Sequence, residues 1–310
     1  MRHTEYNRKR RRRGRGVRRL LPAAVCIALI AFGAGNLIAY FARSHSVKQA
    51  NAALQEIYEQ TPSPTALPEA TAETILPEAI PSETVLPEAV PSQARLRSEY
   101  QSLSGEMLPR MRELFEKNGD LVAWVRIPGV VSLPVVYRDN TYYLNHDFSG
   151  KSSAAGTLFL DERHPLTAQT QHLLIHGHNM HDGSMFGLLS HYRGLDYVLE
   201  HGLVSLSTLY REETYALFAV LIVPDDPGDA RYVPYAGTAA FQSEGQFNAF
   251  IETIRAHSLY EIPIDVQPGD ALLTLSTCLD EDKLVLVCRR LRAGETEEAL
   301  RQALNQSTRR

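Results

Sequence analysis

Short apolar runs recur through the second half of the chain, with turn residues between them. Eight such runs lie between residues 122 and 291, and each has the length of a β-strand. Little helical periodicity separates them, which predicts a closed antiparallel barrel. The runs are 122–129, 134–138, 156–161, 172–177, 202–209, 214–223, 270–278 and 283–291.

Three segments with helical features border or interrupt these runs. The segment from Met107 predicts a helix that ends near Asn118 and Gly119, with the glycine in a left-handed cap. The stretch TEEALRQALNQ near the end of the chain favours a short surface helix. Between Ser243 and His257, apolar residues repeat at the spacing of one helix face, which indicates core packing: Phe247, Phe250, Ile251 and Ile254.

The first 42 residues are patterned differently from the rest. Residues 1–19 hold ten basic residues and one acidic residue, whereas residues 20–42 carry no charge. As a helix, this uncharged segment would measure about 34 Å, enough to cross a bilayer core of ~30 Å. Because the basic residues come first, the positive-inside rule predicts a single-pass protein of the cell membrane, with a cytoplasmic N-terminus and an extracellular folded domain.

A cleaved signal peptide is the alternative for this segment. The apolar region of a signal peptide spans only ~7–15 residues, so an uncleaved anchor is favoured, with Cys26 as a packing residue inside it. The basic run also resembles a nucleic-acid patch. Beside a membrane span this run is more simply a topology signal. Subtracting its +9 from the net charge of -4 leaves about -13, which argues against nucleic-acid binding by the remainder.

Composition then divides the chain into five parts. Prolines are frequent between residues 61 and 93, and they oppose both helix and sheet, which predicts an extended, semi-rigid spacer. The predicted parts are a basic cytoplasmic tail (1–19), a transmembrane helix (20–42), a Pro/Glu/Thr-rich extracellular linker (43–94), a folded domain (95–292) and a C-terminal tail (293–310).

Cysteine and histidine are the residue types that offer covalent chemistry. Three cysteines are too few for a disulfide framework. Cys278 ends the run 270–278, where a side chain can emerge at a barrel mouth, although a cysteine in this position is more often a packing residue. A nearby histidine can supply the reactive thiolate. Spacing alone does not choose among the candidates, which are His172, His176, His178 and His181.

The same histidines raise the question of a metal site. The sequence HGH at residues 176–178 brings two imidazoles close together. No carboxylate or cysteine spacing completes a tetrahedral set of ligands around them. The sequence therefore predicts neither a metal nor another cofactor.

Several stretches resemble signatures of the class B sortases of Gram-positive bacteria. HGHNMHDGSMFGLLSHY (176–192) resembles the histidine motif of that class, and TLSTC (274–278) resembles the motif that ends in its nucleophile. WVRIPG, PVVYRDNTYYLNHDFSG and SSAAGTLFLDER resemble its early strands, so the likeness covers about 190 residues in the order of the family. The resemblance implies a mainly β, sortase-type closed barrel of about eight strands with a few peripheral helices, preceded by one transmembrane helix.

The resemblance also implies a cysteine transpeptidase. Cys278 would attack a carbonyl in a sorting motif near the C-terminus of a secreted protein and form a thioester, with His178 as its acid/base partner. An amine of peptidoglycan or of a pilin would then accept the acyl group. Ser276 and Thr277 would shape the substrate groove. Two alternatives stay open: a cysteine endopeptidase without transfer, and a catalytically impaired surface-binding module on the same scaffold.

One position departs from the family pattern. Sortases place an arginine on the strand after the cysteine, where this chain has Lys283, which lacks the planar fork of a guanidinium. Arg289 shares the strand parity of Lys283, so the two rank equally for this role. If residues 279–282 form a hairpin turn, Cys288 faces Leu273 and is a buried free thiol.

Overall fold

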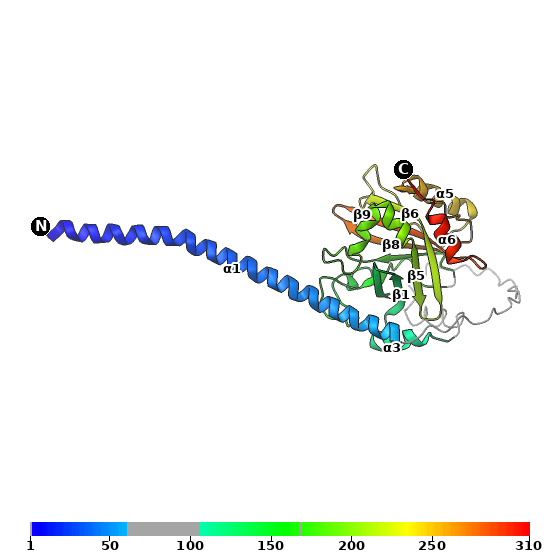
Figure 1. Ribbon diagram of the computed structural model, residues 1–310, viewed down its shortest axis with the longest axis horizontal. Coiled ribbons are helices and arrows are strands. Elements are labelled where there is room, and N and C mark those ends of the chain that lie inside the picture. The colour runs from blue at the N-terminus through cyan, green and yellow to red at the C-terminus, as the bar shows by residue number, and fades with distance from the viewer. Residues whose placement is uncertain (1, 61–105, 168) are drawn as a thin grey trace, which may run out of the picture. The chain divides into compact units, whose positions relative to one another are not determined.

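The computed structural model describes residues 2–60, 106–167 and 169–310, with side chains from residue 29 onward (Figure 1). Contacts divide the chain into two units, Met1–Ala50 and Asn51–Arg310. All the candidate site residues belong to the second unit, together with every β-strand. The fold that positions the site is therefore the fold of the second unit.

Eight strands close into a barrel in the order β1-β2-β3-β4-β8-β9-β6-β5. Each of the eight predicted runs coincides with one of them, so the predicted mainly β closed barrel is confirmed. The strands are β1 (Leu121–Ile127), β2 (Val131–Val136), β3 (Leu158–Leu160), β4 (His172–His176), β5 (Leu203–Thr208), β6 (Glu212–Pro224), β8 (Leu272–Leu279) and β9 (Asp282–Arg290).

The barrel is mixed, and the prediction of a purely antiparallel sheet is wrong. β2 runs parallel to β3, and β4 runs parallel to β8, while the other six neighbouring pairs are antiparallel. Parallel neighbours need a crossover of a dozen or more residues. The connections 137–157 and 177–271 supply that length, and the second of them begins with the histidine motif.

Helices and short 3₁₀ segments surround the barrel. The predicted helices at 107–118, 243–257 and the end of the chain are present, and Ser243 caps the second by accepting a hydrogen bond from Gln246 N. Two further elements were not predicted: η2, which overlaps the end of the histidine motif, and α4, which follows it. The set comprises α3 (Pro109–Lys117), η1 (Tyr142–Leu144), η2 (Gly187–Arg193), α4 (Leu195–His201), α5 (Glu244–Ala256) and α6 (Glu297–Leu304).

Two details of these helices differ from the expectation. Gly119 is not in the left-handed region, because α3 already ends at Asn118, which adopts an extended conformation and donates from Nδ2 to Tyr143 Oη at 2.9 Å. The C-terminal segment is also more than a surface tail. Leu300 and Leu304 of α6 are buried, and β10 (Thr308–Arg309) pairs with β7 (Tyr260–Glu261).

The long N-terminal helix α1 (Arg2–Gln60) includes residues 43–60, the first part of the predicted linker 43–94. The helix ends just before the proline-rich stretch that begins at Pro62, where the extended spacer is predicted. The end of α1 packs on the barrel core: Tyr58 stacks on Trp124 with ring centroids 4.4 Å apart and hydrogen-bonds Ser207 Oγ. The remainder of the predicted linker, 61–94, lies outside the described residues.

No helix in the described part of the chain has both the length and the apolar content needed to cross a bilayer. The predicted transmembrane segment 20–42 begins among residues whose side chains are outside that description. The segment therefore stays a prediction.

His172 is a fully buried histidine on β4. Its Nε2 lies 2.8 Å from Thr274 Oγ1 of the neighbouring strand, and the His164 ring packs edge-on against it. Burial, together with the nearby charge of His164, lowers the pKa of His172 to about 3. The folded protein therefore keeps this imidazole neutral at pH values where an exposed histidine is charged.

We expect the free energy of unfolding to fall as the pH drops below about 6.5, the ordinary histidine pKa. Between that pH and about 3, the unfolded chain binds a proton at His172 that the folded chain does not. Stability therefore decreases toward acid, by at most about 1.4 kcal/mol per pH unit for this group. Urea unfolding at several pH values measures the slope, and a His172→Phe/Thr274→Val variant with an unchanged slope would contradict the assignment.

Candidate active site

Cys278 lies near the end of β8, where the strand leaves the core. Residues 272–277 of β8 are buried, and Cys278 is the first exposed residue after them. β4 runs parallel to β8 with His176 opposite Ser276. Because parallel neighbours leave a barrel at the same end, the segment that carries His178 emerges beside Cys278.

Hydrogen bonds hold these two segments in register. Gly177 N donates to Ser276 O at 3.2 Å, and Thr277 Oγ1 donates to Gly177 O at 2.8 Å. A side chain at position 177 would place its Cβ 2.3 Å from Leu158 Cδ2 and 2.6 Å from Phe186 Cδ2. The glycine between the two histidines is therefore required by the close packing of β3 and the loop after β4.

The His178 ring is oriented by a backbone carbonyl. His178 Nε2 lies 2.8 Å from Leu144 O. A carbonyl oxygen can only accept a hydrogen bond, so Nε2 carries a proton and Nδ1 is the nitrogen left to exchange one. The loop that follows is folded back on His178, since Phe186 N donates to His178 O at 3.0 Å.

A pocket of about 360 Å³, the Cys278 pocket, joins these residues. Both Cys278 and His178 line it, and so do Ser276, Thr277 and Lys283. The structure thus brings together all the predicted site residues except Arg289. The other lining residues are Asn140, Leu144, Phe159, Asp161, Arg163, His176, Gly177, Asp225, Tyr232, Tyr235 and Ala236.

Lys283 lies directly opposite Cys278 in the β8–β9 hairpin, which turns through two residues with Asp280 in the left-handed region. Lys283 Nζ is 3.3 Å from Cys278 Sγ and 3.3 Å from Asp225 Oδ2. Burial lowers the pKa of Lys283, but the negative charges of Cys278 and Asp225 outweigh burial, so the pKa is raised overall. An ammonium group therefore sits against the sulfur and is held charged.

Arg289 does not line the pocket, although the sequence ranked it equally with Lys283. The side chain is 1% exposed, and its guanidinium is hydrogen-bonded to both carboxylate oxygens of Glu295 and to Asp265 O. Strand parity predicts only on which face of the sheet a side chain lies, and not how far along the strand it is. Six residues of strand separate the two positions by about 20 Å, so Arg289 reaches the opposite end of the barrel.

Ser276 and Thr277 form part of the pocket wall with hydroxyl groups that are already engaged. Ser276 Oγ lies 3.1 Å from Tyr235 Oη, and Thr277 binds Gly177 O as described above. Both residues are 2% exposed. Their observed contacts position the strands and the pocket wall, and a direct contact with substrate stays a prediction.

Cys288 is buried on β9 opposite Leu273, in the register that a turn at 279–282 predicts. Burial raises the pKa of its thiol well above the ordinary value. Cys278 and Cys288 are both free cysteines. A disulfide between them would require breaking the β8–β9 register.

A thiol reagent is expected to modify Cys278 in the folded protein at least about a hundredfold faster than Cys288, because only an accessible thiol that can ionise reacts. Peptide mass spectrometry after labelling the native and the denatured protein measures both rates. Comparable native labelling of the two cysteines would contradict the burial of Cys288.

Sequence reasoning missed the carboxylate and the arginine that line the pocket beside His176. Asp161 is 1% exposed and lies 2.9 Å from His176 Nε2 and 2.7 Å from Arg163 Nη2. Burial opposes ionisation of Asp161, but the hydrogen bonds from Arg163 and His176 lower its pKa well below the ordinary value. The motif SSAAGTLFLDER contained both residues, but no local signal tied them to the histidines.

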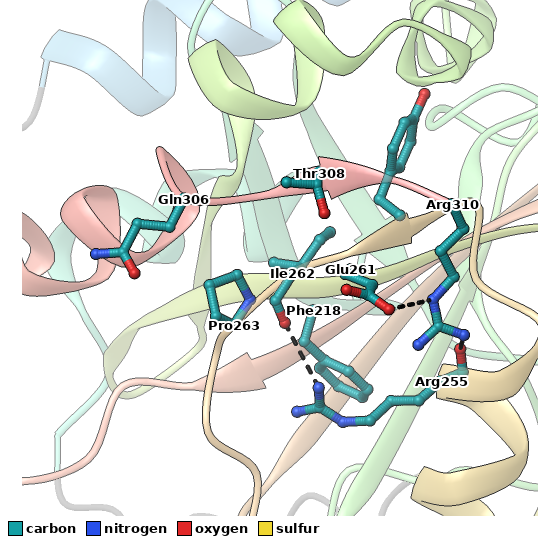
Figure 2. A pocket seen from close by; sticks show the side chains of 9 residues that line it. Phe218, Arg255, Glu261, Ile262, Pro263, Gln306, Thr308 and Arg310 are labelled. Atoms are coloured by element: carbon teal, nitrogen blue, oxygen red, sulfur yellow. Dashed lines mark hydrogen bonds and ion pairs between the residues drawn. The ribbon is translucent and has the colours of Figure 1, made fainter.

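Figure 2 shows a second cavity, of about 440 Å³, where β7 and β10 pair. Its arginines are bound to the backbone: Arg255 Nη2 donates to Ile264 O at 2.5 Å, and Arg310 Nη1 donates to Arg255 O at 2.8 Å. The lining of this cavity includes no cysteine or histidine. Among the described residues, no group of three or more histidine, cysteine or acidic residues is arranged to hold a metal ion.

Comparison with known proteins agrees with this geometry. A sortase B of Listeria monocytogenes is 29% identical over 179 residues, which cover 57% of this chain and 70% of that protein. A sortase B of Staphylococcus aureus is 24% identical over 192 residues, which cover 60% and 76%. No protein-family model matches the chain.

Solved structures show the same barrel. Sortase B from Bacillus anthracis aligns with a TM-score of 0.62 and 23% identity, over 81% of this chain and 99% of that one. Sortase B from Listeria monocytogenes aligns with a TM-score of 0.51 and 29% identity, over 58% and 99%. The fold and these relatives support a cysteine transpeptidase of the sortase type. Within the sortases, the chain is a homologue of class B.

Proposed function

We propose that this protein is a membrane-anchored sortase that cleaves a sorting motif in secreted proteins and transfers the acyl part to an amine. The observation that carries the proposal is the contact of Lys283 Nζ with Cys278 Sγ, 3.3 Å apart, in the pocket that His178 also lines. A cation beside an exposed thiol favours the thiolate, which is the nucleophilic form.

The geometry suggests a role for each group. Cys278 Sγ attacks the scissile carbonyl, and His178 Nδ1 gives a proton to the leaving amine, which leaves a thioester on the sulfur. The acceptor amine then attacks the thioester and passes a proton back to the same nitrogen. Lys283 stabilises first the thiolate and then the negative oxygen of each tetrahedral intermediate, the role that the family resemblance implies for an arginine.

Membrane anchoring is supported by the exposed face of α1. The large hydrophobic residues that are exposed in the described chain all lie between Leu29 and Phe41, and they are 43% to 71% exposed. Such a cluster is costly in water and suits a bilayer. The basic run before it supports a cytoplasmic N-terminus, so the barrel would work outside the cell. The exposed residues are Leu29, Ile30, Phe32, Leu37, Ile38, Tyr40 and Phe41.

The substrates are proposed by analogy. One solved relative is a Staphylococcus aureus sortase B in complex with substrate, which aligns with a TM-score of 0.55 and 21% identity. We propose that sorting motifs of the NPxTN or LPxTG type enter the Cys278 pocket. The acceptor would be an amine of peptidoglycan or of a pilin.

Mass spectrometry of the protein mixed with such peptides tests the proposal. The expected result is a thioester adduct on the peptide that contains Cys278, and its conversion to a ligated product when an oligoglycine or lysine-containing amine is added. Hydrolysis without ligation would show an endopeptidase instead. No adduct with any sorting peptide, while Cys278 still reacts with a thiol reagent, would indicate an impaired binding module.

A further inference from the structure

Lys283, the basic residue in contact with the Cys278 sulfur, has no planar fork with which to orient a carbonyl group. One guanidinium does line the Cys278 pocket, and it comes from a different part of the chain. Arg163 follows β3, and it is the arginine among the described residues of the lining. We infer that Arg163 binds a carbonyl oxygen of the sorting peptide; this inference rests on the proposed function.

Arg163 is held in place by a buried carboxylate. Its Nε donates to Asp161 Oδ1 at 2.9 Å, and its Nη2 donates to Asp161 Oδ2 at 2.7 Å. His176 Nε2 lies 2.9 Å from Asp161 Oδ2, and Asp161 itself is 1% exposed. Two parallel hydrogen bonds to a carboxylate that cannot move fix the plane of the guanidinium, so little freedom is lost when a ligand binds.

The outer edge of the guanidinium is available to a ligand. A guanidinium has five N–H groups, and the two hydrogen bonds from the Arg163 side chain to Asp161 leave three. The Arg163 side chain is 62% exposed although its partner is buried. These donors therefore extend from the pocket wall into the space that a bound peptide would occupy.

The charge balance indicates which oxygen Arg163 would bind. Asp161 neutralises Arg163 at contact distance, so the pair carries little net charge toward the pocket. A neutral carbonyl oxygen, from the peptide backbone or from an amide side chain, then suits the site better than a second carboxylate, which would face Asp161. Tyr232 and Tyr235 line the same pocket and supply further polar groups.

The position of Arg163 indicates which part of the peptide it would contact. Phe159, His176 and Ser276 lie in one row across β3, β4 and β8. That row spans about 10 Å, the length of about three extended residues. The acyl part must stay bound through both half-reactions, whereas the leaving part must make room for the amine. The Cys278 pocket therefore holds the acyl part, and from this spacing we place the Arg163 contact about three residues before the cleaved bond.

Two-substrate kinetics on the full chain test this role. We expect Arg163→Gln to raise KM for the sorting peptide about ten- to a hundredfold, the usual effect of losing a charge-assisted hydrogen bond. KM for the amine should not change, because the amine takes the place of the leaving part, whereas Arg163 contacts the acyl part. Arg163→Lys should recover only part of the loss, since it keeps the charge without the fork. Arg126→Gln, on an exposed residue of β1, is the matched control and should match wild type.

Two sorting peptides that differ three residues before the cleaved bond distinguish a backbone carbonyl oxygen from a side-chain amide oxygen. If the loss in Arg163→Gln is the same with asparagine or leucine three residues before the cleaved bond, the oxygen is a backbone carbonyl. If the loss disappears with leucine, the oxygen is a side-chain amide. Alkylation of Cys278 at the wild-type rate shows that each variant is folded.

Three results would overturn the inference. A KM for the peptide within twofold of wild type in Arg163→Gln would do so while leaving the proposed function intact. An equal loss of Cys278 alkylation in Arg163→Gln and Arg163→Lys would show a merely structural role. A wild-type protein that forms no acyl-enzyme would overturn both this inference and the proposed function.

Discussion

A His178→Gln variant is expected to lose between about 99% and 99.99% of kcat, the range that removal of a positioned acid/base produces. Glutamine keeps a hydrogen bond to Leu144 O, which His178 Nε2 contacts at 2.8 Å, but it cannot exchange a proton at the position of Nδ1. Protonation of the leaving amine and deprotonation of the acceptor would both fail. Steady-state transpeptidation of a fluorescence-quenched sorting peptide measures the loss.

Two other histidines provide the controls. His181 lies in the same loop and is exposed, so His181→Gln should retain wild-type turnover. His176 lines the pocket and is held by Asp161, an arrangement that resembles the oriented histidine of a catalytic triad. If His176→Gln abolished turnover and His178→Gln did not, the acid/base role would belong to His176.

The sequence predicted those features that depend on neighbouring residues. Eight strand segments followed from their apolar pattern, and the two-residue turn between β8 and β9 determined that register. From the turn alone, Cys288 was expected opposite Leu273, and the structure has this pair. Hairpin register is set by loop length and side-chain parity, both of which are local.

Features that join distant segments could not be predicted in this way. The pairing of β4 with β8, which brings His178 beside Cys278, connects residues about a hundred positions apart and depends on closure of the whole barrel. Spacing alone did not choose His178 from its neighbours, and only the family motif did so. Arg289 was ranked equally with Lys283 because parity was considered without the distance along the strand.

Asp161 and Arg163 illustrate the same limit inside the site. Each is unremarkable in the sequence, since an acid and an arginine two residues apart are usually a surface pair. Their place in the pocket follows from the pairing of β3 with β4. In this pairing Asp161 N donates a hydrogen bond to Leu174 O, and the Asp161 carboxylate lies against His176 Nε2. A buried carboxylate with several donors is visible only once the strands are assembled.

Lys283→Gln is expected to lower kcat/KM about a hundred- to a thousandfold, the usual effect of removing one group that stabilises a developing oxyanion. Glutamine is close in length to lysine and removes the charge that lies 3.3 Å from Cys278 Sγ. The rate of Cys278 alkylation at neutral pH should fall in the same variant, since the thiolate loses its neighbouring cation. Peptide turnover and iodoacetamide labelling measure the two effects separately.

Lys283→Arg is the informative partner of that variant, because it keeps the positive charge and adds a planar fork. We expect its activity to stay within about tenfold of wild type, since the positive charge is kept and only its shape changes. Arg231→Gln removes a nearby positive charge that is paired with Asp229 and Asp282 instead of the sulfur, so it should have no effect. If Lys283→Gln turned over like Arg231→Gln, the ammonium at the sulfur would have no part in catalysis, and the pocket would have to stabilise the oxyanion with other groups.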